Sequence, residues 1–124
     1  MQVLPAWLRH CYLVEEEGRK IRYSDMYKPG GTNADFVEVS ADGSVSFRIY
    51  ERGVEAETLS SGSGATACAL VAARQLGLSS PIKVKARGGN LVVEFHRDTI
   101  GNFKEISYTG PVELVFETEM DVTS

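Results

Sequence analysis

The residues best suited to chemistry stand in one short run, Ser60-Ser61-Gly62-Ser63-Gly64. An apolar helix is predicted directly after it, over residues 65–76, with Gly77 as its C-terminal stop. The first turn of a helix has unpaired N–H groups and a partial positive charge, and glycines let a ligand approach the backbone closely. Such a loop can bind a carboxylate or a phosphate. It can also be a serine cap with no ligand, and the local pattern leaves both interpretations open.

Two other active-site loops are excluded by spacing. A phosphate-binding Walker loop needs Gly-Lys followed by Ser or Thr, which is absent here. A nucleophile elbow needs Gly-x-Ser-x-Gly, and the run 61–64 is one residue short of that spacing. The loop is therefore a candidate for binding an anion and not for either of these reactions.

Four further polar residues are candidates, each with a plain structural alternative. Glu51 and Arg52 follow a predicted strand and precede the loop, where they form either a binding pair or an exposed ion pair. Asn33 follows Gly30-Gly31 and could contact a ligand or occupy a turn. His10 is an isolated histidine, which is often structural or exposed.

The bulk properties narrow the class of protein. The 124 residues suit one domain over 1–124, and 43% hydrophobic content supports a real core. A net charge of −4 disfavours nucleic acid or an anionic membrane as the main partner. No apolar run approaches the roughly 18 residues that span a bilayer. Cys11 and Cys68 share no metal or redox spacing, so the sequence predicts no metal site and a reduced, cytoplasmic protein.

The predicted elements define an α+β fold. Strands are expected at 11–14, 35–39, 44–50, 81–86, 91–96, 105–108 and 112–118. Asp42-Gly43 is a hairpin signal, and residues 15–31 are predicted to be a polar loop. The helix 65–76 is apolar nearly all round, which predicts burial on nearly all sides. We therefore expect a strongly curved mixed or antiparallel sheet, a half-barrel to a barrel, wrapped around one central buried helix.

Three motifs, in order along the chain, resemble those of the diaminopimelate epimerases. The run Glu51-Arg52-Gly53 to Glu57-Thr58-Leu59-Ser60-Ser61-Gly62-Ser63-Gly64-Ala65 is similar to that family's Glu-Arg-Gly…Glu-Thr-Leu-(Ala/Ser)-Cys-Gly-Thr-Gly-Ala. Gly31-Thr32-Asn33-Ala34-Asp35-Phe36-Val37 is similar to its Gly-Thr-Asn-x-Asn-Phe-Val. Tyr108-Thr109-Gly110-Pro111-Val112 matches its Thr-Gly-Pro element. The resemblance covers residues from about 18 to 120.

The resemblance implies a fold, a reaction and roles for residues. Family members have two similar lobes, and this chain resembles the second. They interconvert LL- and meso-diaminopimelate, precursors of lysine and peptidoglycan, without a cofactor, using two cysteines on opposite faces of the α-carbon. By resemblance, position 61 is catalytic, and Asn33, Glu51, Arg52, Gly62 and Ser63 bind substrate. His10, in Arg9-His10-Cys11-Tyr12, is a weaker catalytic candidate as a remnant of a Pro-His pair.

Two departures bear on activity. Serine stands at position 61 where the family has its cysteine, and we expect these 124 residues to lack the first lobe with its partner cysteine. We therefore expect an inactive substrate-binding half, in which residues 1–17 are a possible remnant of an interdomain strand. The alternative is a non-enzymatic module that homodimerises or binds a small ligand. The expected partners are an amino-acid substrate or anion at 61–64, and either a second copy or the missing lobe.

Overall fold

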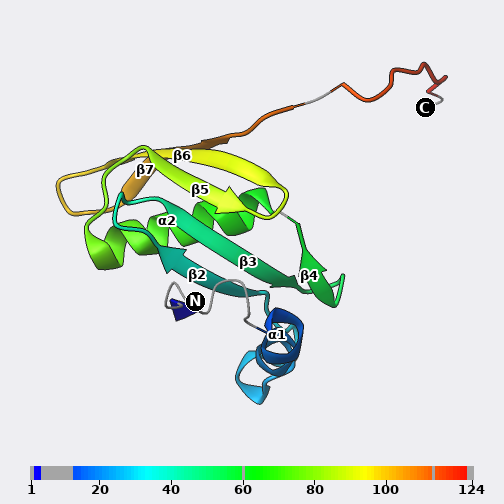
Figure 1. Cartoon of the computed structure of the whole chain (residues 1–124), viewed down its shortest axis with the longest axis horizontal. Helices are drawn as coiled ribbons and strands as arrows, with labels where there is room; N and C mark the ends of the chain where they lie inside the picture. The colour runs from blue at the N-terminus through cyan, green and yellow to red at the C-terminus, as the bar shows by residue number, and fades with distance from the viewer. Residues whose placement is uncertain (1, 4–12, 60, 113, 123–124) are drawn as a thin grey trace.

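One open, mixed β-sheet organises the protein (Figure 1). The computed structural model describes residues 2–3, 13–59, 61–112 and 114–122. The strands follow the spatial order β1-β2-β3-β5-β6-β7, with β4 paired to β3 beside this path. Their bounds are β1 Gln2–Val3, β2 Ala34–Val39, β3 Val45–Glu51, β4 Ala56–Thr58, β5 Ile82–Ala86, β6 Gly89–Arg97 and β7 Phe103–Thr109. The order starts and ends on different strands, so the sheet is not closed into a barrel.

The strands predicted between residues 35 and 108 are confirmed within a few residues. β2 and β3 form the expected hairpin, and at its turn Asp42 Oδ1 accepts hydrogen bonds from both the N–H and the hydroxyl of Ser44. Gly43 has φ +84°, which glycine adopts without strain. β5 and β6 form a second antiparallel hairpin, whereas β3 and β5 are parallel. The connection between those parallel strands contains β4 and the helix α2, Gly62–Leu76.

Helix α2 packs one face onto the sheet. Its buried residues are Gly64, Ala65, Cys68, Ala69, Ala72 and Ala73. On the opposite side Ser63 and Ala67 are exposed, so burial on nearly all sides is not observed. The reason is residue size, since an exposed alanine costs little and an apolar pattern built from alanines does not require a partner on every side. Instead of being a central helix wrapped by the sheet, α2 therefore packs on one face of an open sheet.

A second helix, α1, Val14–Arg22, covers the other side of β2 and β3. The loop predicted over 15–31 is wrong for residues 15–22, which belong to this helix, but its end at Pro29-Gly30-Gly31 is a turn and loop as predicted. The strand predicted over 11–14 is wrong at its described residues, because Leu13 precedes the helix and Val14 begins it, whereas residues 11 and 12 lie outside the described residues. Three glutamates occupy the first turn of α1 and three basic residues the last, which complements the helix dipole. Gly18 lies on the buried side, where a Cβ would be 2.4 Å from Tyr50 Cβ. A short 3₁₀ turn, η2, Asp25–Tyr27, follows.

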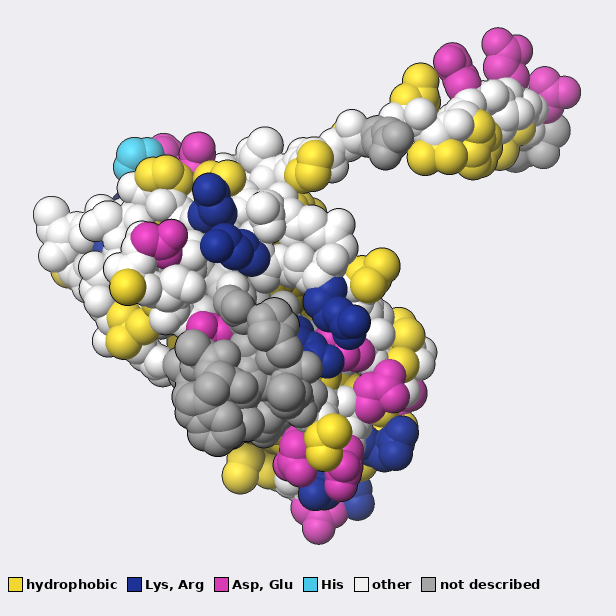
Figure 2. All heavy atoms as spheres, viewed as in Figure 1, with side chains coloured by type: hydrophobic (Ala, Val, Ile, Leu, Met, Phe, Trp, Pro, Cys, Tyr) yellow, Lys and Arg dark blue, Asp and Glu magenta, His cyan; other side chains and the backbone are white. Residues whose placement is uncertain are grey.

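The C-terminal segment extends away from the sheet (Figure 1). A strand was predicted over 112–118, but the described residues of this segment form no strand. In Figure 2 its acidic side chains project from the upper side, and apolar side chains gather along the lower side, with a further apolar group above. Val112, Leu114 and Phe116 are at least 78% exposed. The alternating pattern is present, but a strand also needs a neighbouring strand edge for its backbone hydrogen bonds.

Candidate functional site

The loop singled out by the sequence begins helix α2. Ser61 is the N-cap in extended conformation, and its Oγ accepts a hydrogen bond from the N–H of Gly64 at 3.1 Å. The hydroxyls of Ser61 and Ser63 lie 3.3 Å apart. The predicted serine cap is therefore present. Ser60 lies outside the described residues.

A residue that sequence reasoning missed lies against this loop. A Cβ added to Gly62 would be 2.5 Å from Cζ of Tyr108 and 2.6 Å from its hydroxyl oxygen. Tyr108 is on β7 and 56% exposed, and among the described residues its hydroxyl has no hydrogen-bond partner. Its phenol therefore forms a polar wall beside the first residue of α2. The only local signal was its place before Thr109-Gly110-Pro111, which says nothing about contact with Gly62.

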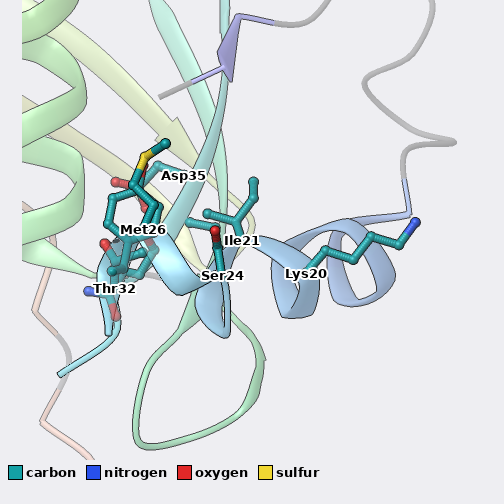
Figure 3. A pocket seen from close by; sticks show the side chains of 9 residues that line it. Lys20, Ile21, Ser24, Met26, Thr32 and Asp35 are labelled. Carbon is teal, nitrogen blue, oxygen red and sulfur yellow. Dashed lines mark hydrogen bonds between the residues drawn. The ribbon is translucent and has the colours of Figure 1, made fainter. Parts of the chain in front are cut away.

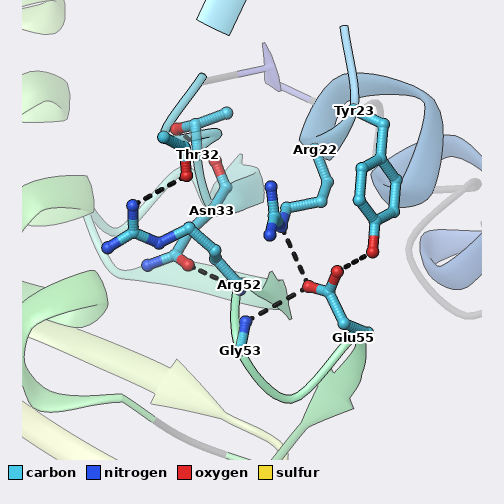
Figure 4. Close-up of polar contacts among 8 residues, drawn as sticks. Arg22, Tyr23, Thr32, Asn33, Arg52, Gly53 and Glu55 are labelled. Carbon is cyan, nitrogen blue, oxygen red and sulfur yellow. Dashed lines mark hydrogen bonds and ion pairs between the residues drawn. The ribbon is translucent and has the colours of Figure 1, made fainter. Parts of the chain in front are cut away.

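Asn33 and Arg52, two predicted binding residues, lie in direct contact (Figure 4). Asn33 Oδ1 accepts a hydrogen bond from the backbone N–H of Arg52 at 2.7 Å. One terminal nitrogen of the Arg52 guanidinium donates to the Gly30 carbonyl at 2.9 Å. Asn33 thus fixes the end of β3, and Arg52 in turn fixes the loop before β2.

The turn after Arg52 is held by a second polar group (Figure 4). Glu55 adopts φ 60° and accepts hydrogen bonds from the Tyr23 hydroxyl, from Nε of Arg22 at 2.9 Å and from the Gly53 N–H at 3.2 Å. The hydrogen bond from Tyr23, with the help of Arg22, holds the pKa of Glu55 below its usual value. The carboxylate therefore stays charged and joins α1 to the β3–β4 turn.

Glu51 lies on the sheet face that α2 covers. Alternation along β3 places it on the same side as Phe47 and Ile49, which belong to the core packed against α2. The Thr58 hydroxyl donates to Glu51 Oε1 at 3.4 Å. Because Thr58 closely precedes the cap Ser61, this contact links Glu51 to the segment that leads into the loop.

Asp35 and Cys68 form a polar pair on that same face. Cys68 is 1% exposed, and burial raises the pKa of its thiol well above the usual value. Burial also raises the pKa of Asp35, although the hydrogen bond with Cys68 acts in the opposite direction. Oδ1 of Asp35 is buried without a hydrogen-bond partner. The surroundings of Asp35 therefore disfavour the charged form of its carboxyl group.

A pocket of about 440 Å³ opens between the end of α1, η2 and the start of β2 (Figure 3). Its lining residues are Lys20, Ile21, Ser24, Met26, Tyr27, Thr32, Asn33, Ala34 and Asp35. Asn33 is the one predicted binding residue among them, whereas the 61–64 loop lies elsewhere. The structure thus brings Asn33, Arg52 and Glu51 to one corner and does not place the loop in the same pocket.

The histidines and possible metal ligands were also located. His10 and Cys11 lie outside the described residues. His96 is exposed, with Nε2 3.4 Å from a carboxylate oxygen of Glu105. In the described part of the chain, no group of three or more His, Cys, Asp or Glu side chains is placed to hold a metal ion. No helix in that part is long and apolar enough to cross a membrane.

The fold and this loop define an α+β domain in which a capped, glycine-rich helix start adjoins a sheet corner of polar residues. The family model described as "Diaminopimelate epimerase" matches residues 10–115. The chain is 47% identical over 107 residues to a diaminopimelate epimerase of Flavobacterium psychrophilum, and 43% identical over 102 residues to that of Aquifex aeolicus. This chain belongs to the diaminopimelate epimerase family.

The match covers most of this chain but a minority of its relatives. It includes 85% of the chain and 41% of the Flavobacterium protein, and 81% of the chain and 35% of the Aquifex protein. The chain therefore spans about two fifths or less of the length of these relatives. A crystal structure of a Bacillus anthracis phenazine biosynthesis protein of the PhzF family aligns with 73% of this chain at 23% identity, with a TM-score of 0.49.

Proposed function

We propose that this chain is a substrate-binding half of a diaminopimelate epimerase that does not catalyse epimerisation by itself. One observation carries the proposal: Ser61 stands at the position of the family cysteine, and its hydroxyl caps the helix. Ser61 Oγ accepts from Gly64 N–H at 3.1 Å and contacts the Ser63 hydroxyl at 3.3 Å. This hydroxyl caps the helix and is far less acidic than the thiol that it replaces.

The chemistry of a hydroxyl supports the same conclusion. A thiol has a pKa near about 8.5, which a helix N-terminus lowers further, so a thiolate is available at neutral pH. An aliphatic hydroxyl is far more basic, and it serves as a base only when a neighbouring group removes its proton. Among the described residues, the partners of the Ser61 hydroxyl are the Gly64 N–H and the Ser63 hydroxyl. Neither of them is a general base.

The binding roles follow the family motif and the positions of the side chains. In this proposal a substrate carboxylate binds at the N–H groups of Gly62 and Ser63, where the positive end of the α2 dipole favours an anion. Glu51 and Arg52 contact the amino and carboxylate groups at the distal end of the substrate, and the side-chain amide of Asn33 also contacts the substrate. Their support is the Asn33–Arg52 hydrogen bond and the position of Glu51 on the α2 side of the sheet.

The proposal is tested by α-hydrogen exchange of diaminopimelate in deuterium oxide. We expect no exchange above the buffer rate with the unmodified chain, because position 61 supplies no thiolate. Appreciable exchange by the unmodified chain would overturn the inactive assignment. The Ser61→Cys variant is the matched control. We expect that it gains a reactive thiol but still lacks epimerisation, because the opposite face of the α-carbon has no acid.

We further propose that the chain pairs with a second copy or with a preceding lobe, which is also what the alternative function as a non-enzymatic homodimerising module requires. The exposed apolar side chains of the C-terminal segment support this pairing, because water-exposed apolar patches commonly mark an interface. Sedimentation at high micromolar concentration is the test. A concentration-dependent dimer supports pairing through a second copy, and a monomer at all concentrations contradicts it.

A further inference from the structure

A turn distant in sequence from the candidate site contacts the segment that leads into it. The hairpin between β5 and β6 contains Arg87 and Gly88. The N–H of Gly88 donates to the carbonyl of Leu59 at 2.8 Å, and the guanidinium of Arg87 lies 3.1 Å from Oε2 of Glu57. Leu59 and Glu57 lie two and four residues before the cap Ser61. The turn therefore makes two polar contacts with this segment.

Glu57 is the most enclosed charged group in that arrangement. Its side chain is 9% exposed, and Arg48 on β3 donates two hydrogen bonds of 2.7 Å, one to each carboxylate oxygen. Burial alone would raise the pKa of Glu57, but Arg48 and Arg87 outweigh burial and lower it. The carboxylate thus ties β4 both to the sheet and to the turn.

The side chain of Leu59 does not hold this segment, because it is 67% exposed. The segment is held instead by the backbone hydrogen bond from Gly88 to Leu59, and these two residues are closely packed. A Cβ added to Gly88 would be 3.0 Å from Leu59 Cβ and 3.2 Å from its carbonyl oxygen. Gly88 does not have a positive φ, so the strain expected from an alanine there comes from its close approach to Leu59.

We propose that Arg87 and Gly88 are positioning residues for the Ser61 loop and act through Glu57 and Leu59. The turn sets where the polypeptide enters α2, and therefore where position 61 lies relative to the first N–H groups of the helix. Neither residue touches the loop's expected ligand. The importance of this positioning for binding rests on the proposed function, but the positioning itself can be measured without substrate.

The test uses the thiol of a Ser61→Cys chain, with Cys11→Ser to remove the other thiol whose surroundings are undescribed. Cys68 is buried and stays unreactive. The rate of alkylation by iodoacetamide is measured against pH to give the thiol pKa, and thermal unfolding is recorded for each variant. Gly88→Ala changes no charge. We expect it to raise the thiol pKa by about half a unit, because the thiol moves away from the helix N-terminus. At a pH below the pKa, this change corresponds to about threefold less thiolate.

Arg87→Ala should raise the thiol pKa in the same direction, and Arg87→Lys should restore part of the loss. Lys85→Ala removes an equal charge from the same hairpin, so it is the control for simple charge loss. If Lys85→Ala matches Arg87→Ala and Gly88→Ala leaves the thiol pKa unchanged, the positioning role is wrong. Should Gly88→Ala fail to fold, the contrast among Arg87→Ala, Arg87→Lys and Lys85→Ala still decides.

Calorimetric titration of the parent chain and Gly88→Ala with diaminopimelate separates the two proposals. No binding by the parent chain overturns the proposed function and leaves the thiol result standing. Binding by the parent with a thiol pKa that is unchanged in Gly88→Ala and Arg87→Ala supports the proposed function and overturns the role of the turn. Weaker binding by Gly88→Ala, together with a raised thiol pKa, supports both.

Discussion

The two faces of the sheet are covered by helices of different construction. On the α2 face, thirteen buried residues form one core, built from β2, β3, β5, β6 and the alanine-rich side of α2. On the α1 face, the buried cluster among the described residues consists of Val14, Ala34, Phe36 and Tyr50. Among the described residues, the larger apolar core therefore lies beneath α2.

The difference teaches how each part of the candidate site is held. The Ser61 loop leads into the first turn of α2, where Gly64 is buried and the next residue, Ala65, belongs to the large core. The Asn33–Arg52 corner is held mainly by polar contacts, including the ion pair between Arg22 and Glu55. We therefore expect core substitutions to disturb the loop, and salt or pH to disturb the corner.

The largest effect should come from deleting core volume beneath α2. Ile49 is 1% exposed, and its Cδ1 would lie 3.2 Å from a Cβ placed on Gly64. Ile49→Ala should lower the free energy of unfolding by about 2–5 kcal/mol. Ile21→Ala is the matched deletion on the α1 face, where Ile21 is only partly buried. Urea unfolding should show a clearly smaller loss for Ile21→Ala, and equal losses would contradict the contrast between the faces.

A smaller effect is expected where Tyr108 contacts the first turn of α2. Gly62→Ala should destabilise the chain, because its Cβ would fall 2.5 Å from Tyr108 Cζ. In a Tyr108→Ala chain the same substitution should be neutral or stabilising, since the space is then free and alanine suits a helix. A double-mutant cycle should give a coupling of at least about 0.5 kcal/mol. Additive effects would show that the two residues do not share this space.

The buried carboxyl group of Asp35 predicts how pH changes the stability of the chain. Burial raises the pKa of Asp35 in the folded state, so folding favours its protonated form. The cost of the charged form is absent below the unfolded pKa of about 3.9 and grows as pH rises through the folded pKa. Asp35→Asn should therefore stabilise the chain at pH 7 by more than about 0.5 kcal/mol, beyond a typical surface change. Urea unfolding at pH 7 and at about pH 3 should show the gain disappearing in acid; an equal gain at both would exclude this cause.

The smallest effect is expected on the outer side of α1. Lys20 Nζ lies 3.1 Å from Glu17 Oε1, and both side chains are well exposed. Glu17→Gln should change the free energy of unfolding by less than about 0.5 kcal/mol, because water and salt screen such pairs. Thermal unfolding in low and high salt should differ little from the parent chain. A loss above 1 kcal/mol would mean that the surface charges of α1 matter more than its few buried residues.

The sequence predicted the structure best where the residues that contact each other are close together in the chain. The β2–β3 hairpin followed from Asp42-Gly43 and the alternation after it, and α2 followed from its alanine-rich run. The helix was observed to begin three residues earlier than predicted, because Gly62, Ser63 and Gly64 form its first turn. β4 was not predicted, since three residues carry too little pattern.

The errors arose where structure depends on distant partners. α1 was missed because its buried side is formed by Val14, Gly18 and the half-buried Ile21, and a glycine does not look like a core residue until Tyr50 packs on it. The strand over 112–118 was predicted from alternation, which cannot supply the neighbouring edge. In the candidate site, the cap at Ser61 was readable locally. The contact of Gly62 with Tyr108 and that of Glu57 with Arg87 join residues far apart in the chain.

The central claim is that the N-terminus of α2 binds the carboxylate of an amino-acid substrate even without the family cysteine. The most direct test is a titration of the ¹⁵N-labelled chain with diaminopimelate, followed by the backbone amide signals of Gly62, Ser63 and Gly64. The account predicts saturable shifts at these amides and at Arg52, with no change in the stereochemistry of the ligand. If the amide signals of residues 62–64 do not shift, the account is contradicted, whether or not other amide signals shift.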